Sequence, residues 1–425
     1  MTIRANKRSF VVAVAVLLAV PALAWLATTD NSAVWPARNI LQYRLLTWWW
    51  EHTAQAAEEL PGTLEGTVSD ARGRPIEGAW VLLARRDGTT YRDRSDAAGQ
   101  YHIAGLPPGT YRPVAGATGY DSVQFGDSAA RVQISSGAAT EADASLPAEP
   151  VHAVTAGHDF FLGEAGTRSC ESPLASNALR RQIHFQSDHQ PNQPAFYYTP
   201  LTTTTTSRWP LVLAIYPGPA DTWECASLPL AEAGYAVLAT GPAYSFDLEA
   251  DIDELARLLE FVRAGQFPGT DGDRIAILGG SYSSLHVQRL LQRREPVRAA
   301  MLLGPPTDLF DMRRRLENGS YIPPFGLDQA LIALGFPDRV PLRYWRYSGA
   351  YHVRSDFPPL AILHSRSDQV VPYQQSELLI EHLSQVGATY EAHFFDGGSH
   401  YLLAEESDAQ DIYRISLAFL EKYLQ

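Results

Sequence analysis

The sequence predicts an α/β domain with a doubly wound sheet, preceded by a small all-β sandwich and an N-terminal hydrophobic helix. Three observations lead to this prediction. Residues 10–27 carry no charge, short alternating segments separated by Gly and Pro fill residues 61–150, and strand and helix patterns alternate across residues 151–425. A length of 425 residues fits two or three domains, since about 100–200 residues per domain is usual.

The composition excludes several classes of protein. Hydrophobic residues make up 45% of the chain and charged residues 19%, which is typical of a globular protein and not of a coiled coil or a disordered chain. The net charge of −13 argues against nucleic-acid binding. Cys170 and Cys225 are too few for a disulfide scaffold, although one bridge between them is compatible with the sequence. No Cys/His cluster has zinc-site spacing, so neither a metal nor another cofactor is predicted.

Residues 1–30 are predicted to be a signal peptide or a signal anchor. Three basic residues precede the uncharged run 10–27, whose 18 residues lie at the short end of a membrane span. Ala22-Leu23-Ala24 fits a small-x-small cleavage site, so a cleaved signal and an uncleaved anchor are both compatible with the sequence. Either one places the rest of the chain outside the cytoplasm.

Residues 31–60 are predicted to form a juxtamembrane helix, with helical character from 39 to 59. This helix carries Trp48, Trp49 and Trp50. Such a cluster suits a membrane interface, packing on the protein's own domain, or a protein partner.

Residues 61–150 have the pattern of a small β-sandwich. Strands are predicted at 79–83 and around Tyr101 and Ile103, with turns at 71–75 and 96–99. Their spacing and turn residues resemble the carboxypeptidase regulatory-like family, a transthyretin-like sandwich. That resemblance implies an accessory module without chemistry of its own. The residues that carry it are Gly66, Gly73, Pro75, Gly78, Asp96, Gly99, Tyr101, Leu106, Pro108, Gly109 and Tyr111.

Strands and helices alternate from residue 151 to residue 425. Residues 210–216 and 235–240 are continuous apolar runs, which are typical of parallel strands buried on both faces. The alternation predicts a doubly wound sheet. Further strands are predicted at 274–278, 299–303, 360–364 and 390–395, and helices around 252–262, 285–290, 378–386 and 412–423.

Residues 305–355 interrupt this alternation, and we predict that they form a lid above the sheet. Aromatic residues in this segment suit an apolar acyl pocket or, equally, the core of the lid itself. They are Phe310, Tyr321, Phe325, Phe336, Tyr344, Trp345 and Tyr347.

The strand ending at Leu278 runs through Gly279-Gly280-Ser281-Tyr282-Ser283 into a helix. This is the arrangement of a nucleophile elbow, in which small residues flank a serine on a tight strand-to-helix turn. Ser283 replaces the usual second glycine. The position of the motif predicts an α/β-hydrolase fold with Ser281 as the nucleophile.

A serine hydroxyl needs an adjacent base that is itself oriented by an acid, and in this fold the chain order is serine, acid, histidine. Asp368 follows the strand at 360–364, and His400 follows the strand that ends at Phe395. We predict that these two residues complete a triad. Asp396 is the rival for the acid role, while His364 and His393 belong to strands and are interpreted as structural.

Catalysis by such a triad also requires two hydrogen-bond donors for the oxyanion. The backbone N–H of Tyr282 is the first candidate. Pro217 and Pro219 have no N–H, so the loop after residue 216 offers few backbone donors. The phenol of Tyr216 is the second candidate, and a buried core tyrosine is the alternative interpretation.

These motifs resemble the prolyl oligopeptidase family of serine hydrolases, especially its dipeptidyl peptidase IV branch, over residues 180–425. The resemblance implies that Ser281, Asp368 and His400 are the triad and that Tyr216 is an oxyanion donor. The family's β-propeller is not expected within these 425 residues, since its blades take about 40–50 residues each and residues 61–150 leave room for only a small sandwich. Release of dipeptides is therefore not predicted. The motifs that match are residues 216–219 (YPGP), 271–283 and the Asp368 loop with Val371-Pro372.

The sequence thus predicts an exported serine hydrolase that cleaves a small ester or peptide through an acyl-enzyme on Ser281. The alternative is a weakly active or inactive hydrolase-fold scaffold in a membrane-associated complex, anchored through residues 10–27 or binding a partner through Trp48–Trp50.

Overall fold

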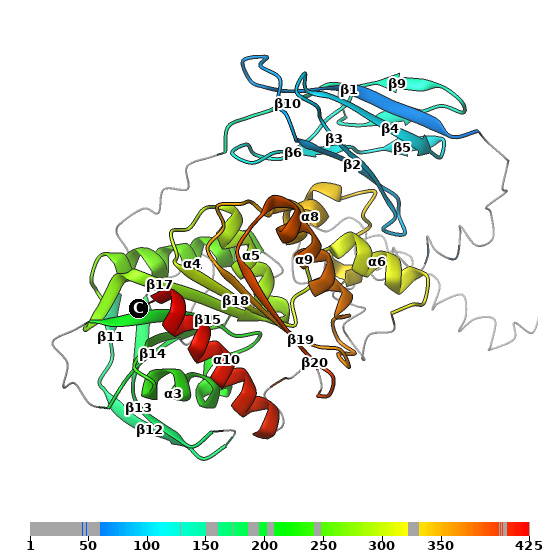
Figure 1. The fold of residues 1–425 in the computed structure, drawn as a ribbon. Helices are drawn as coiled ribbons and strands as arrows, with labels where there is room; N and C mark the ends of the chain where they lie inside the picture. Colours follow the sequence, from blue (N-terminus) through cyan, green and yellow to red (C-terminus); the bar gives the residue numbers. More distant parts are fainter. Residues whose placement is uncertain are drawn as a thin grey trace, which may run out of the picture.

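The computed structural model describes residues 45, 48, 60–127, 129–149, 160–172, 174–185, 195–201, 208–241, 248–321, 331–398, 400, 402 and 406–424. It contains a β-sandwich that lies against one side of a larger α/β domain (Figure 1). The predicted hydrophobic helix at 10–27 lies outside the described residues, as does nearly all of the predicted helix at 39–59. In the part of the chain that is described, no helix has the length and apolar character needed to cross a membrane.

The sandwich consists of two main sheets. One has the strand order β10-β1-β4, with β9 also paired to β1, and the other has the order β3-β2-β6-β7. A short additional sheet pairs β5 with β8. The core between the sheets includes Leu64, Val81, Leu83 and Ile103. The strands are β1 (Gly62–Asp70), β2 (Trp80–Ala84), β3 (Thr90–Arg94), β4 (Gln100–Leu106), β5 (Gly109–Tyr111), β6 (Val114–Gly116), β7 (Val123–Gln124), β8 (Val132–Ile134), β9 (Ala139–Glu141) and β10 (Ala144–Leu146).

The α/β domain is built on one large sheet with the order β11-β13-β14-β16-β15-β17-β18-β19-β20. The strands from β16 to β20 are parallel, and the strands before them pair antiparallel at one edge. The strands are β11 (Phe160–Leu162), β12 (Gly166–Cys170), β13 (Ser176–Phe185), β14 (Ala195–Thr199), β15 (Trp209–Ile215), β16 (Ala236–Thr240), β17 (Thr270–Gly280), β18 (Ala299–Leu303), β19 (Leu360–Ser365) and β20 (Tyr390–Phe395).

Helices cover both faces of this sheet, as the doubly wound prediction requires. The helices α3 (Glu224–Glu232) and α10 (Glu406–Leu424) pack on one face, and α4 (Leu248–Arg263), α5 (Ser284–Gln292) and α9 (Gln374–Val386) pack on the other (Figure 1). Strand β15 is buried on both faces, which explains its unbroken apolar run. The predicted α/β-hydrolase fold with an N-terminal β-sandwich is therefore confirmed.

The segment between β18 and β19 contains α6 (Leu309–Glu317), α8 (Pro341–Arg346) and the 3-10 helix η4 (Gly349–His352). In Figure 1, α8 lies on the side of the α/β domain that faces the sandwich, and α6 lies next to it. Most aromatic side chains of the segment between β18 and β19, including Phe310, Tyr344 and Trp345, belong to a buried core and not to a substrate pocket. Their interpretation as a core is thus supported for these residues, while Phe325 lies outside the described residues.

Strand β2 joins the two domains through its alternating side chains. Val81 and Leu83 face the sandwich core, whereas Leu82 and Ala84 belong to the buried core of the α/β domain. Successive side chains of a strand point to opposite faces, so a single strand serves two cores. Polar contacts add to this junction, because Trp345 Nε1 donates to Ser122 Oγ (2.9 Å) and Arg92 donates to the Tyr351 hydroxyl (2.6 Å).

The hairpin turn between β2 and β3 brings the backbones of the two domains close together. A Cβ placed on Gly88 would lie 2.4 Å from the carbonyl oxygen of Phe310 in α6. Gly88 has φ +87°, whereas Gly105, with φ +76°, has no heavy atom within 4 Å of the position that a Cβ would occupy. The turn therefore needs a glycine at residue 88 for both conformation and space.

We expect Gly88→Ala to destabilise the chain more than Gly105→Ala. Both variants force a side chain into the left-handed region, at a cost of about 1–2 kcal/mol. Only Gly88→Ala adds a clash with α6, worth about 1–3 kcal/mol more. Denaturant unfolding of the two variants measures the difference, and equal losses would show that this turn does not pack on α6.

Candidate active site

Ser281 lies on the turn between β17 and α5, in the left-handed backbone conformation with φ +53°. A non-glycine residue there is strained, and such strain is a feature of the nucleophile elbow. A Cβ on Gly279 would come within 2.7 Å of Val287 and 2.8 Å of the Ser283 carbonyl oxygen, so the turn is tight enough to exclude a side chain. The geometry explains the first small residue of the motif.

The second small residue of the motif, Ser283, is fully buried. Its hydroxyl accepts a hydrogen bond from the Gly280 N–H (3.0 Å) and lies within hydrogen-bonding distance of the carbonyl oxygens of Gly280 and Ile215. A buried hydroxyl with such partners carries little penalty. Serine therefore replaces glycine here without loss of the elbow geometry.

The structure brings Ser281, His400 and Asp368 into one hydrogen-bonded chain. His400 Nε2 lies 2.7 Å from Ser281 Oγ, and His400 Nδ1 lies 2.7 Å from Asp368 Oδ2. Because a carboxylate only accepts, Nδ1 carries the proton and Nε2 is left to accept from the serine hydroxyl. This tautomer is the one that a general base for Ser281 requires.

The rival acid, Asp396, is not part of this chain. Its side chain is 94% exposed and pairs with Arg366 at 3.4 Å. His393 is also outside it, since its Nε2 faces Glu391 at 4.0 Å. The geometry therefore favours Asp368 for the acid position.

Four donors hold the Asp368 carboxylate. The backbone N–H groups of Val370 and Val371 donate to Oδ1 at 2.8 and 2.9 Å, and His400 and His364 approach Oδ2 at 2.7 and 3.1 Å. Burial alone would raise the pKa of Asp368, but the hydrogen bonds from His364 and His400 outweigh it and hold the pKa well below its usual value. The carboxylate is therefore ionised at neutral pH.

His364 has a role that the sequence analysis did not assign. Its Nε2 faces two acceptors, Asp368 Oδ2 and the Val371 carbonyl oxygen (3.0 Å), so Nε2 carries the proton. Its Nδ1 lies 2.7 Å from Ser376 Oγ. The fully buried His364 ring thus holds the Asp368 carboxylate in place by donating to Oδ2. The spacing of four residues between His364 and Asp368, across a strand end, is the only signal in the sequence for this contact.

Further hydrogen bonds continue from this region to the sandwich. Gln375, next to Ser376, accepts from the N–H groups of Thr307 and Asp308 at 2.9 and 2.8 Å. Asp308 caps the N-terminus of α6 and accepts from the Tyr351 hydroxyl at 2.8 Å. Tyr351 in turn accepts from Arg92 of β3. The acid loop, the insertion and the sandwich therefore share one polar framework.

The candidate oxyanion donors lie in different surroundings. Tyr282 follows Ser281 at the start of the 3-10 helix η3 (Ser281–Ser283). Tyr216 lines the same cavity as Ser281, its ring stacks on Trp223 at 5.5 Å, and its hydroxyl lies 2.8 Å from Ser227 Oγ. Burial raises the pKa of the Tyr216 phenol, so it remains protonated and able to donate.

Two apolar cavities flank Ser281. The first, of about 80 Å³, lies towards Tyr216, Trp223 and Ile412. The second, of about 110 Å³, lies towards Leu285 and the insertion. No Asp, Glu, Lys or Arg is among the described residues that line either cavity. The insertion residues that line the second cavity are Pro306, Leu309, Met312, Tyr321, Leu331 and Leu334.

Two further chemical features are clear in the described part of the chain. No group of three or more His, Cys, Asp or Glu side chains is arranged to hold a metal ion there. Cys170 of β12 and Cys225 of α3 form a disulfide, with their Cα atoms 5.6 Å apart. The bridge fastens α3, which carries the Tyr216 partner Ser227, to the edge of the sheet.

Comparison with protein families identifies both domains. Residues 63–147 match the carboxypeptidase regulatory-like domain, and residues 249–425 match the prolyl oligopeptidase family. The matches confirm the resemblance to the carboxypeptidase regulatory-like family and, over residues 249–425, the resemblance to the prolyl oligopeptidase family. A search of curated proteins found no match to this chain.

Solved structures of hydrolases resemble the chain at low sequence identity. An esterase from Thermogutta terrifontis is 17% identical with a TM-score of 0.45, over 56% of this chain and 91% of the esterase. An acetyl ester-xyloside bifunctional hydrolase from Caldicellulosiruptor lactoaceticus is 20% identical with a TM-score of 0.44, over 56% of this chain and 90% of that one. An acylaminoacyl peptidase from Pyrococcus horikoshii is 18% identical with a TM-score of 0.48, over 74% of this chain and 54% of the peptidase.

The hydrogen-bond geometry predicts very different results for the two candidate acids. Asp368→Asn leaves His400 without an acceptor for its Nδ1 proton, so the reaction of Ser281 with a fluorophosphonate probe should slow by about 10³–10⁴-fold. Asp396→Asn changes only an exposed ion pair and should leave the labelling rate within a few-fold. The reverse order of the two rates would transfer the acid role to Asp396.

Proposed function

We propose that this serine hydrolase, whose residues 249–425 match the prolyl oligopeptidase family, cleaves an ester or amide bond through an acyl-enzyme on Ser281. The observation that carries the proposal is the hydrogen-bonded chain from Ser281 through His400 to Asp368, with 2.7 Å at both links. The strained backbone of Ser281 is a second, independent support.

In the proposed mechanism, Ser281 Oγ attacks the substrate carbonyl carbon while His400 Nε2 takes the hydroxyl proton. The tetrahedral intermediate collapses, the bond to the leaving group breaks, and His400 returns the proton to the leaving alcohol or amine. A water molecule then attacks the acyl-enzyme in the same way and releases the acid and free Ser281. Asp368 remains ionised throughout and stabilises the imidazolium that forms in each step.

The direct test compares wild type with Ser281→Ala. We expect the wild type to react with a fluorophosphonate probe and Ser281→Ala not to react. On an activated ester, the variant should lose at least about 10³-fold in kcat. The alternative function, an inactive scaffold, predicts no labelling of a folded wild type.

We also propose that Tyr216 and the Tyr282 N–H hold the oxyanion. Tyr216 borders the cavity of Ser281, and its hydroxyl proton is available for the oxyanion when Ser227 donates to the phenol oxygen. Ser227 is fully buried and thereby fixes where the phenol points. In this arrangement, Tyr216 is the donor and Ser227 positions it.

Tyr216→Phe should then lower kcat by about 10²–10³-fold with little change in KM, because the lost hydrogen bond matters chiefly in the transition state. Ser227→Ala is the matched control. It removes the partner of the phenol and leaves the phenol in place, so its loss of kcat should be smaller. Were both variants to keep wild-type kcat while losing about 1 kcal/mol of stability, the Tyr216–Ser227 pair would be purely structural.

The two cavities beside Ser281 support an uncharged substrate that is apolar on both sides of the scissile bond. Apolar walls favour apolar groups, and neither cavity has a described carboxylate for the ammonium group of a peptide. We propose that the insertion at 305–355 acts as the lid of the second cavity, since it supplies six of its lining residues. A panel of acyl esters of increasing chain length, together with aminoacyl amides, distinguishes an esterase from a peptidase.

We propose that the chain acts outside the cytoplasm. The charge-free run at 10–27 and the Cys170–Cys225 disulfide both support this location, since stable disulfides form mainly in oxidising compartments. Residues 10–27 would provide a membrane anchor if they are retained, and Trp48–Trp50 a contact for a membrane or a protein partner.

Protease added to intact spheroplasts of the producing cells should therefore degrade residues 60–425. A cytoplasmic protein in the same sample serves as the control for lysis. Complete protection of the chain until the cells are broken would contradict export. Sequencing the N-terminus of the mature protein separates a cleaved signal from a retained anchor.

A further inference from the structure

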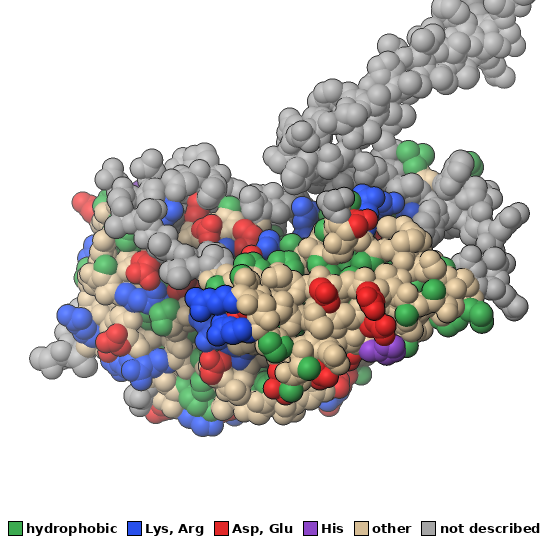
Figure 2. Space-filling model, turned by 90° about the horizontal axis from the view of Figure 1, so that it is seen from above, with side chains coloured by type: hydrophobic (Ala, Val, Ile, Leu, Met, Phe, Trp, Pro, Cys, Tyr) green, Lys and Arg blue, Asp and Glu red, His purple; other side chains and the backbone are tan. Residues whose placement is uncertain are grey.

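Two large cavities lie at the junction between the sandwich and the α/β domain. Their volumes are nearly equal, at about 600 and 610 Å³, and both are within the usual range for ligand sites. Over the described surface seen from above, acidic and basic side chains are interspersed (Figure 2). The two cavities nevertheless differ in the balance of charged side chains that line them, and this balance determines which ligands each can bind.

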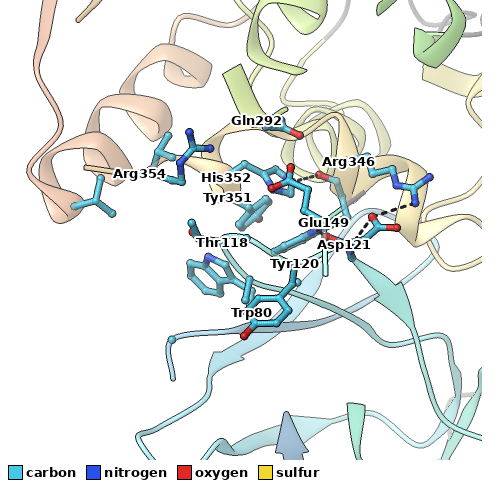
Figure 3. Close-up of a pocket in the computed structure, with 18 of the residues that line it drawn as sticks. Trp80, Thr118, Tyr120, Asp121, Glu149, Gln292, Arg346, Tyr351, His352 and Arg354 are labelled. Carbon is cyan, nitrogen blue, oxygen red and sulfur yellow. Dashed lines mark hydrogen bonds and ion pairs between the residues drawn. The ribbon is translucent and has the colours of Figure 1, made fainter. Parts of the chain in front are cut away.

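The first junction cavity is electrically balanced. Four arginines and four acids line it. Figure 3 shows one of their pairs, between Arg346 and Asp121. Arg289 pairs with Glu249 at 3.0 Å, Arg354 with Asp356 at 2.8 Å, and Arg346 with Asp121 at 3.6 Å. The fourth, Arg94, lies over the ring of Trp80 at 4.2 Å. Three of the four arginines therefore pair with acids that line the same cavity.

The second junction cavity has an excess of positive charge. Five arginines line it against three acids, in a chain whose net charge is −13. One of these acids, Glu317, is already paired with the buried Arg313, which is not part of the lining, at 2.8 Å. The lining arginines are Arg85, Arg86, Arg112 and Arg131 of the sandwich and Arg339 of the insertion.

Arg112 lies in the same cavity lining as Arg131 and Arg339, and both of them repel it. Partial burial is the main cause that lowers the pKa of Arg112, and the charges of Arg131 and Arg339 lower it further. Arg112 Nη1 donates only to the backbone carbonyl oxygen of Arg339 (3.3 Å). Within the described chain, neither Arg112 nor Arg131 forms an ion pair with a carboxylate.

The acid that partly balances these charges is Asp338. It lies 3.6 Å from Arg339 Nε and also feels the charges of Arg86 and Arg112. Burial raises the pKa of Asp338, which opposes its ionisation. With Glu317 paired to Arg313, Asp87 and Asp338 are the two acids left to balance five arginines, so the cavity keeps an excess of positive charge.

We propose that this second junction cavity is an anion-binding site for a phosphate group, held by Arg112, Arg131 and Arg339. Guanidinium groups bind phosphate oxygens through paired, charge-assisted hydrogen bonds, and a group with two negative charges matches a cluster of arginines better than a single carboxylate does. A bound phosphate would relieve the repulsion within the cluster. Since Arg112 and Arg131 come from the sandwich and Arg339 from the insertion, it would also contact both domains.

The test measures the binding of inorganic phosphate to the full chain by calorimetry at fixed ionic strength. We expect saturable binding by wild type and a loss of affinity of about tenfold or more in Arg112→Ala/Arg131→Ala, since each lost charge-assisted hydrogen bond is worth that much. Arg72→Ala is the matched control. Arg72 follows the C-terminal end of β1, whereas the N-terminal end of that strand, at Gly62, pairs with Leu106 near the cavity. The Arg72→Ala variant should therefore bind phosphate with wild-type affinity.

Arg112 also contacts the insertion, so Arg131→Ala alone is the second variant. Arg131 is exposed, and its loss should weaken phosphate binding without changing the unfolding midpoint. The source of the phosphate follows from two further probes, glycerol 3-phosphate and anionic vesicles of phosphatidic acid compared with neutral vesicles of phosphatidylcholine, because both anionic probes carry a phosphomonoester. Arginine-dependent binding of the soluble probe alone indicates a free phosphoester, and arginine-dependent binding to the anionic vesicles indicates a lipid headgroup. If wild type and Arg112→Ala/Arg131→Ala bind all probes equally, or if neither binds any, the proposal is wrong.

Discussion

The candidate active site depends on the hydrogen bonds that hold the buried carboxylate of Asp368. This carboxylate is nearly fully buried, and two backbone N–H groups and two histidine rings surround it. An unpaired buried carboxylate would take up a proton and lose its charge. The four donors prevent this, so one ionised group fixes the tautomer of His400 and thereby the acceptor that faces Ser281. Loss of the His364 hydrogen bond, or of either backbone one, would affect Ser281 only through this carboxylate and His400.

Further hydrogen bonds connect the surroundings of Asp368 to the insertion and to the sandwich. Gln375 and Ser376 stand next to each other at the start of α9, one bonded to the insertion and the other to His364. The insertion is bonded in turn to Arg92 of the sandwich through Tyr351. A series of hydrogen bonds thus connects the sandwich, an accessory module by its family resemblance, to the residues that contact the acid loop.

The sequence predicted the residues whose positions are set locally and missed those set by packing between distant segments. Ser281 was predictable because the elbow occupies five consecutive residues, and Asp368 and His400 because they follow strand ends in a fixed order. The contacts of His364 with Asp368 and of Ser227 with Tyr216 depend on which side chains meet in the folded core, and nothing in their immediate sequence specifies them. The aromatic residues of the insertion illustrate the same limit, since composition alone does not separate a substrate pocket from a core.

Strand β2 shows how a local pattern carries information about domain assembly. A sandwich strand that faces solvent on one side alternates apolar and polar residues, as β4 does with Tyr101 and Ile103 inside. In β2 the run Val81 to Ala84 is apolar throughout, and the structure buries both of its faces. Since Leu82 and Ala84 belong to the core of the α/β domain, separating the domains would expose apolar surface that the sandwich alone has no means to cover. The continuous apolar run in an otherwise alternating domain therefore marks the surface on which the second domain packs.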